Sequence, residues 1–237
     1  MQKPFQPICL KSLQTGTKPL ARLFHNYYMI SQPIFQDRID AGLALCQHLH
    51  HYKNVDGVTL AVPRGGVPVA LPVAKILQLP LELILSKKIG HPMHKEFAIG
   101  AVSLTGQVIT PNAFASDEYI QQETLHIREQ LRAMYKKFMG NKQPTPLKGK
   151  VVIIIDDGVA TGHTLLSTVE MIKHECPKKL VIAVPVASRQ AAQKLSGEVD
   201  EFVCVWIPSH FRSVGEFYSN FEQISDEEVI TMLGSPK

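Results

Sequence analysis

The stretch Val151-Val-Ile-Ile-Ile-Asp-Asp-Gly-Val-Ala-Thr-Gly-His-Thr164 predicts a buried strand, an acidic turn and the start of a helix. Its first five residues are all β-branched and apolar, which is typical of a parallel strand buried on both faces. Two carboxylates and a short loop between Gly158 and Gly162 follow at once. Leu165, Val169 and Ile172 then recur at helical spacing. The stretch therefore indicates an α/β fold.

This strand–loop–helix unit suits a phosphorylated sugar. Backbone N–H groups of the loop and of the helix N-terminus can receive a phosphate, and the carboxylates can face hydroxyls or a metal ion. The alternative is a buried strand whose acids only cap a turn, but a turn needs neither adjacent acids nor the Thr161-Gly-His-Thr164 that follows. The sequence contains neither a Gly-x-x-x-x-Gly-Lys loop nor a Gly-x-Gly-x-x-Gly motif, which argues against the common nucleotide-binding folds.

Asp156–Thr164 resembles the 13-residue phosphoribosyl pyrophosphate (PRPP) signature of type I phosphoribosyltransferases. Three further segments resemble the same family: Leu60–Ala70, which looks like a core strand and its pyrophosphate loop; Lys87–Gly90 with Phe97–Val102; and Phe211–Tyr218 with Asp226–Val229. Together they cover about residues 34–233. The pattern is similar to a poorly characterised bacterial branch of the superfamily.

The resemblance implies a mainly parallel sheet flanked by helices, with a small hood formed by residues of about 30–57 and 207–233. It implies transfer of a 5-phosphoribosyl group from PRPP to a nucleobase or similar nitrogen nucleophile, with release of pyrophosphate. Mg²⁺ is the expected cofactor, held mainly by PRPP and only indirectly by Asp156 and Asp157. A homodimer is expected. The alternative is a PRPP-sensing regulatory protein on the same fold, because fold alone does not decide function.

Site roles follow from the resemblance. The catalytic residues are expected to be Asp156, Asp157 and Lys88, with the two aspartates at the ribose hydroxyls. Arg64-Gly65-Gly66 is expected to wrap pyrophosphate on a loop that often carries a strained or cis peptide, with Lys87 or Lys88 as a further cation; exposed strand-end charge is the alternative for the lysines. The PRPP-binding residues are then Arg64, Gly65, Gly66, Lys87, Lys88, Asp156, Asp157, Gly158, Ala160, Thr161, Gly162, His163 and Thr164.

Two positions depart from the family pattern. Position 163 is His where many relatives have a small residue, so its imidazole is either an added donor or a surface group. Position 160 is Ala where 6-oxopurine enzymes place an Asp beside the base, which argues against that mechanism. His91, His94 and Glu96 are candidates for proton transfer.

Bulk properties fit a folded domain with a small anionic ligand. The 237 residues are 45% hydrophobic and carry a formal net charge of +4, without a Lys/Arg block typical of nucleic-acid arms. Four cysteines without a Cys-x-x-Cys spacing predict neither disulfides nor zinc. No apolar stretch has the ~20 residues of a membrane span, and a cytoplasmic location is expected. Residues 1–29 are expected to form a tail, of which residues 1–28 are expected to be dispensable, and residues 30–237 to form the domain.

Periodicity predicts the remaining elements. Ile39, Leu43, Cys46 and Leu49 indicate a helix from Asp37, and a second helix after Gly66 is expected to pack through Val69, Val73 and Ile76. A long helix over 117–139 is expected to turn Ile120, Leu125 and Leu131 inward. Strands are predicted at 58–62, 81–86, 181–186 and 202–206, a hairpin at 97–103 and 107–110 turning at Thr105-Gly106, and a helix at 188–195.

Overall fold

The computed structural model describes residues 34–110 and 114–234. Its core is a five-stranded parallel sheet in the order β2-β1-β6-β7-β8. The strands are β1 (Gly57–Ala61), β2 (Leu81–Leu83), β6 (Val151–Ile155), β7 (Lys179–Val186) and β8 (Glu201–Trp206). The central strand β6 is buried along its whole length, as its five β-branched residues predict. The mainly parallel sheet expected from the sequence is confirmed.

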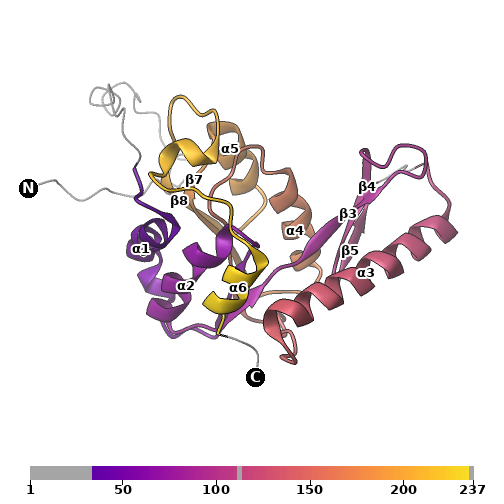
Figure 1. The fold of residues 1–237 in the computed structure, drawn as a ribbon, viewed down its shortest axis with the longest axis horizontal. Helices are drawn as coiled ribbons and strands as arrows, with labels where there is room; N and C mark the ends of the chain where they lie inside the picture. Colours follow the sequence, from indigo (N-terminus) through magenta and orange to yellow (C-terminus); the bar gives the residue numbers. More distant parts are fainter. Residues whose placement is uncertain (1–33, 111–113, 235–237) are drawn as a thin grey trace, which may run out of the picture.

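Helices cover both faces of this sheet (Figure 1). On one face lie α1 (Arg38–Leu49) and α2 (Gly66–Leu77), which pack against each other. On the other face lie α4 (His163–Lys173) and α5 (Arg189–Ser196), through Leu165, Val169, Ile172 and Leu195. The short helices η3 (His50–Tyr52), η4 (Val214–Phe217) and α6 (Asp226–Met232) complete the core region. The result is a three-layer α/β domain.

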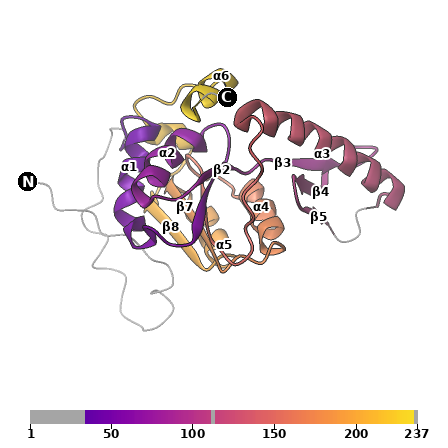
Figure 2. The same cartoon turned by 90° about the horizontal axis from the view of Figure 1, so that it is seen from below.

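A second, antiparallel sheet forms a wing that projects from the core. The wing consists of β3 (Ser86–Gly90), β4 (Ala98–Ser103), β5 (Gln107–Ile109) and α3 (Asp117–Met139). Figures 1 and 2 both show it to the right of the core, with α3 lying along it. Ion pairs of Lys137 with Asp226 (2.7 Å) and Glu227 (3.8 Å) connect the end of α3 to α6. The wing is therefore tied to the C-terminal segment as well as to β2.

Three expectations from the sequence, two about the wing and one about α2, were wrong. The run at 81–86 is not one strand: β2 joins the core sheet and β3 begins the wing. Leu125 is 61% exposed and Ile76 is 41% exposed, although both were expected to face inward. The hairpin at Thr105-Gly106 is confirmed as β4 and β5.

Segments from the two ends of the described chain lie side by side. Backbone N–H groups of Ile34 and Phe35 donate to the carbonyl of Phe217 at 3.0 and 2.9 Å, and Phe35 forms a parallel bridge with Tyr218. Phe35 and Tyr218 are buried together, with partly buried aromatic rings around them. The N-terminal tail expected over 1–29 lies outside the described residues. Within the described ranges, no helix is long and apolar enough to cross a membrane.

Candidate functional site

Two loops that the sequence singles out meet at the carboxyl edge of the sheet. Strands β1 and β6 are neighbours in register, with Ala61 opposite Ile155, and the Val62 N–H donates to the Ile155 carbonyl at 2.9 Å. The loop after β1 therefore lies against the acidic pair after β6. The expected cis peptide is present in it, between Pro63 and Arg64.

The glycines of the first loop allow this close approach. A Cβ on Gly65 would lie 2.0 Å from Oδ2 of Asp157, and a Cβ on Gly66 would lie 2.6 Å from the Ile155 carbonyl oxygen. Non-bonded contacts of a Cβ atom are essentially never that short, so a side chain at position 65 would displace the Asp157 carboxylate. The two motifs, about 90 residues apart in sequence, form one packed unit.

Contacts with the segment after β7 anchor the second loop. Val159 pairs with Ala187 beyond β7, and the Ser188 hydroxyl donates to the Ala160 carbonyl at 2.6 Å. Gly162 has a positive φ of 74° and caps α4, whose first residue is His163. Thr161, His163 and Thr164 are exposed around this turn. Exposed hydroxyls and free N–H groups at a helix start form a cradle that suits a phosphate.

The acidic pair lies in a low-dielectric setting. The Asp157 N–H donates to Oδ1 of Asp156 at 2.9 Å, and Nε of Arg38 donates to Oδ2 of Asp157 at 2.8 Å. Burial, followed by the neighbouring Asp157 charge, raises the pKa of Asp156 well above its usual value. Burial also raises the pKa of Asp157, and the hydrogen bond and charge of Arg38 oppose that rise. Because two like charges lie this close together, the site favours a ligand that donates hydrogen bonds or brings positive charge.

Arg38, Tyr218 and Phe221 complete the site, and none of them was expected there from the sequence. Arg38 pairs with Asp157, and its guanidinium carbon lies 3.8 Å from the centroid of the Phe221 ring. The Tyr218 hydroxyl donates to the Asp157 carbonyl at 2.5 Å. Tyr218 stood in a segment that resembled the family, which was the one signal in the sequence. Arg38 and Phe221 carried none, because their contacts join residues far apart in the chain.

The expected pyrophosphate cations have other partners in this structure. Nη1 of Arg64 lies 3.5 Å from Oδ1 of Asp226, and the Arg64 side chain is 39% exposed. Lys87 donates to Oε1 of Gln130 at 2.7 Å, and Lys88 pairs with Glu96 at 2.8 Å. Arg64 therefore stands in the loop beside the acidic pair, whereas the two lysines lie on β3 and are engaged within the wing. Their role at pyrophosphate stays a prediction.

The candidate groups for proton transfer also lie in the wing. His91 contacts the backbone of Met93 and Phe114 through its two ring nitrogens. His91 and His94 stack with ring centroids 6.0 Å apart, and Glu96 is paired with Lys88. The lysine lowers the pKa of Glu96, so this carboxylate is a poor proton donor in this arrangement.

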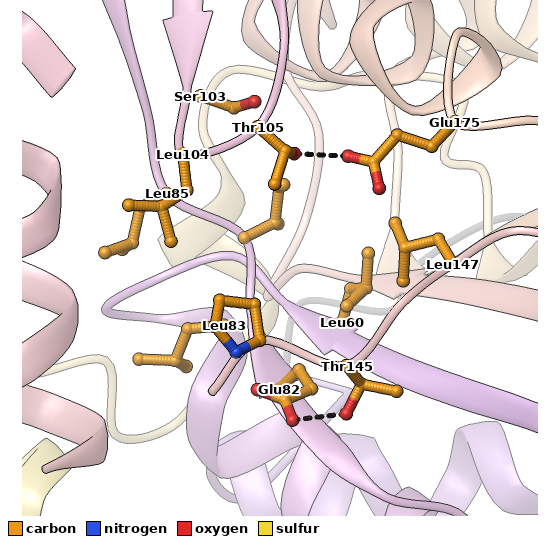
Figure 3. A pocket seen from close by; sticks show the side chains of 12 residues that line it. Leu60, Glu82, Leu83, Leu85, Ser103, Leu104, Thr105, Thr145, Leu147 and Glu175 are labelled. Carbon is orange, nitrogen blue, oxygen red and sulfur yellow. Dashed lines mark hydrogen bonds between the residues drawn. The ribbon is translucent and has the colours of Figure 1, made fainter. Parts of the chain in front are cut away.

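A separate pocket lies where the wing joins the core. Figure 3 shows the side chains that line it, which come mainly from β2, the start of the wing and the loop before β6. Its cavity volume is about 40 Å³. Five leucines, with Ile84 and Pro144, form the apolar part of its wall. In the polar part, Glu82 accepts from Thr145 Oγ1 at 2.7 Å, and Thr105 donates to Glu175. None of its lining residues belongs to the two loops, so the pocket is not part of the candidate site.

A metal ion bound here would be held jointly by the protein and by the bound substrate. Among residues 34–110 and 114–234, no group of three or more His, Cys, Asp or Glu side chains is placed to hold a metal. The acidic pair supplies two carboxylates, and Mg²⁺ is often bound by one or two carboxylates together with substrate phosphates and water. The residues present fit that mode.

Comparisons with known proteins point to one family. A family model described as a phosphoribosyl transferase domain matches residues 34–221. A Mycobacterium tuberculosis (strain CDC 1551 / Oshkosh) protein, provisionally named a phosphoribosyl transferase, is 35% identical over 205 residues. That match covers 84% of this chain and 46% of the relative, so this chain spans about half the length of the curated relatives it matches.

Solved structures are similar as well. A crystal structure of a Thermus thermophilus protein has 35% sequence identity and a TM-score of 0.72, over 84% of this chain and 97% of that one. A purine phosphoribosyltransferase from Pyrococcus horikoshii has 26% identity and a TM-score of 0.41, over 70% of this chain and 81% of that one. The second score is too low to support any inference about substrate.

Proposed function

This chain belongs to the phosphoribosyl transferase family, and we propose that it transfers the 5-phosphoribosyl group of PRPP to a nucleobase or similar nitrogen nucleophile, releasing pyrophosphate. The observation that carries the proposal is the contact between the loop at Gly65 and the Asp157 carboxylate. A ligand that spans both loops has to offer phosphate oxygens at each end and hydroxyls between them. PRPP has that order of groups.

Each group of PRPP has a counterpart in the site. The turn from Ala160 to Thr164 receives the 5′-phosphate through backbone N–H groups and the exposed threonine hydroxyls. The acidic pair accepts from the ribose hydroxyls, which relieves the repulsion between the two neighbouring carboxylates. Backbone groups of Gly65 and Gly66 and the Arg64 side chain hold the pyrophosphate.

The reaction asks for positioning and charge stabilisation rather than for a protein nucleophile. Positive charge develops on the ribose as pyrophosphate leaves, as in glycoside transfer, and the neighbouring carboxylates stabilise that charge. Mg²⁺, when bound with PRPP, supplies positive charge to the departing pyrophosphate. Lys88 would add a cation only if its contact with Glu96 is exchanged for the ligand.

The acceptor is not a typical 6-oxopurine in this proposal. Residue 160, where that class of enzyme carries an acid next to the base, is Ala, and its carbonyl is held by Ser188. Proton removal from the acceptor must then rely on another group. A nucleophile that is deprotonated before it attacks meets this condition best.

A pyrophosphate-release screen tests the function. The full chain is incubated with PRPP and Mg²⁺ and with each of a panel of nucleobases and small nitrogen nucleophiles, and the Asp156→Asn/Asp157→Asn protein is the matched control. We expect release with at least one acceptor, and none above background from the control. Tight PRPP binding without release from any acceptor would contradict a transferase and favour a PRPP-sensing protein.

A further inference from the structure

Arg38 is a buried cation that joins the acidic pair to the C-terminal segment. It is the first residue of α1, after the N-cap Asp37, and its side chain is 11% exposed. Nε donates to Oδ2 of Asp157 at 2.8 Å, and Nη1 donates to the carbonyl of Glu222 at 2.9 Å. Its guanidinium lies over the Phe221 ring. The planar fork of an arginine makes these contacts at once, and the single ammonium group of a lysine does not reproduce them.

These contacts fix the position of Asp157 from several sides. Arg38 contacts the carboxylate, Tyr218 contacts the backbone carbonyl, and the backbone of Gly65 leaves no space beyond Oδ2 for even a methyl group. A carboxylate restrained in this way keeps one orientation before a ligand arrives. Such restraint lowers the entropic cost of binding.

Arg38 also decides how charge is distributed over the pair. The titratable and charged groups that face the Asp157 carboxylate are Asp156, Arg38 and Tyr218. Burial raises the pKa of both aspartates, and at Asp157 the direct hydrogen bond from Arg38 opposes that rise. The guanidinium therefore favours negative charge on Asp157 over negative charge on Asp156.

We propose that Arg38 is a positioning residue of the ribose subsite, which holds the Asp157 carboxylate in the orientation that accepts the ribose hydroxyls. The inference rests on the proposed function, because it needs a ribose 5-phosphate group between the two loops. Arg38 acts through Asp157 and makes no contact with the sugar itself. Arg38 should therefore affect the binding of any molecule with a 5-phosphoribosyl group, whatever the acceptor is.

Ribose 5-phosphate is the probe that isolates this subsite, because it lacks the pyrophosphate. Calorimetry on the full chain compares Arg38→Gln, Asp157→Asn and the double variant. We expect Arg38→Gln to weaken ribose 5-phosphate about tenfold, roughly the value of one charged hydrogen bond, and the double variant to bind within about twofold of Asp157→Asn. Losses that multiply in the double variant would show that Arg38 does not act through Asp157.

Two further variants complete the test. Arg38→Lys keeps the charge and should retain part of the affinity, also if Arg38→Gln folds poorly. Phe221→Leu removes the ring under the guanidinium but leaves Asp157 its partner, so it should lower thermal stability and weaken ribose 5-phosphate less than Arg38→Gln does. An affinity that falls as far in Phe221→Leu as in Arg38→Gln would contradict the positioning role. A wild type that binds neither PRPP nor ribose 5-phosphate would instead refute the proposed function itself.

Discussion

At the scale of single residues, the site depends on how little space separates Gly65 from Asp157. Gly65 has ordinary right-handed helical dihedral angles, φ −62° and ψ −34°, so an alanine would fit the backbone. The three atoms nearest to an added Cβ all belong to the Asp157 carboxylate. A single methyl group can therefore probe the acidic pair without a change of charge.

Gly65→Ala should weaken ribose 5-phosphate and PRPP by at least tenfold, because the methyl group displaces the Asp157 carboxylate from the ligand. Gly197→Ala is the matched control: that glycine also has a right-handed backbone, and the nearest atom to an added Cβ is 3.7 Å away. Calorimetry of both variants checks the prediction. Equal affinities in the two variants would mean that Asp157 does not face the ligand.

Asp156 should cost stability at neutral pH. Its folded-state pKa is raised by burial and by Asp157, so the folded state loses stability as pH rises from the unfolded value of about 3.9 through the folded pKa. Asp156→Asn should be more stable than the wild type at pH 7, by about 1 kcal/mol, and the difference should vanish near pH 4. Urea unfolding at both pH values measures this. A wild type more stable than the variant at pH 7 would contradict the expected burial of charge.

At the scale of elements, the sequence predicts what depends on local periodicity. The strand at Val151 and the helix with Leu165, Val169 and Ile172 lie where expected, because a buried β-branched run and an apolar stripe are local signals. The division of residues 81–90 between two sheets is not such a signal. Residues 81–85 are apolar except for Glu82, and this acid is the one irregular feature of the run. Its partners come from segments far along the chain.

Glu82 attaches the wing to the core. It is 3% exposed, accepts from Tyr135 of α3 at 2.8 Å and from Thr145 at 2.7 Å, and pairs with Lys142 at 2.8 Å. A buried carboxylate needs all such partners. The contact with Tyr135 connects β2 to α3, so it should contribute to how the wing is held.

Tyr135→Phe should lower the free energy of unfolding by about 2 kcal/mol, since it removes one buried hydrogen bond to a charged group, and the melting temperature by roughly 4–8 °C. Lys142→Met removes another partner of the Glu82 carboxylate. The Lys142 side chain is 45% exposed, so this variant should lose less than about 1 kcal/mol of the free energy of unfolding. Thermal and urea unfolding compare the two. A larger loss for Lys142→Met would place the main support of Glu82 at the surface.

At the scale of the whole molecule, residues from four separate regions of the sequence form the site. The parallel sheet brings the loops after β1 and β6 to one edge, and the terminal segments supply Arg38, Tyr218 and Phe221 beside them. The two loops could be predicted because each follows a recognisable strand. The terminal contributions could not, because the Arg38–Asp157 contact spans 119 residues and depends on the packing of the whole domain.

In the proposed function, PRPP binds between these two loops. Calorimetric titration of PRPP with Mg²⁺ into the wild type and into Asp156→Asn/Asp157→Asn measures whether it does, because the substitution keeps size and removes charge. We predict saturable binding to the wild type and affinity lower by an order of magnitude or more in the variant. Unchanged affinity in a folded variant would contradict the assignment of the acidic pair to the ribose.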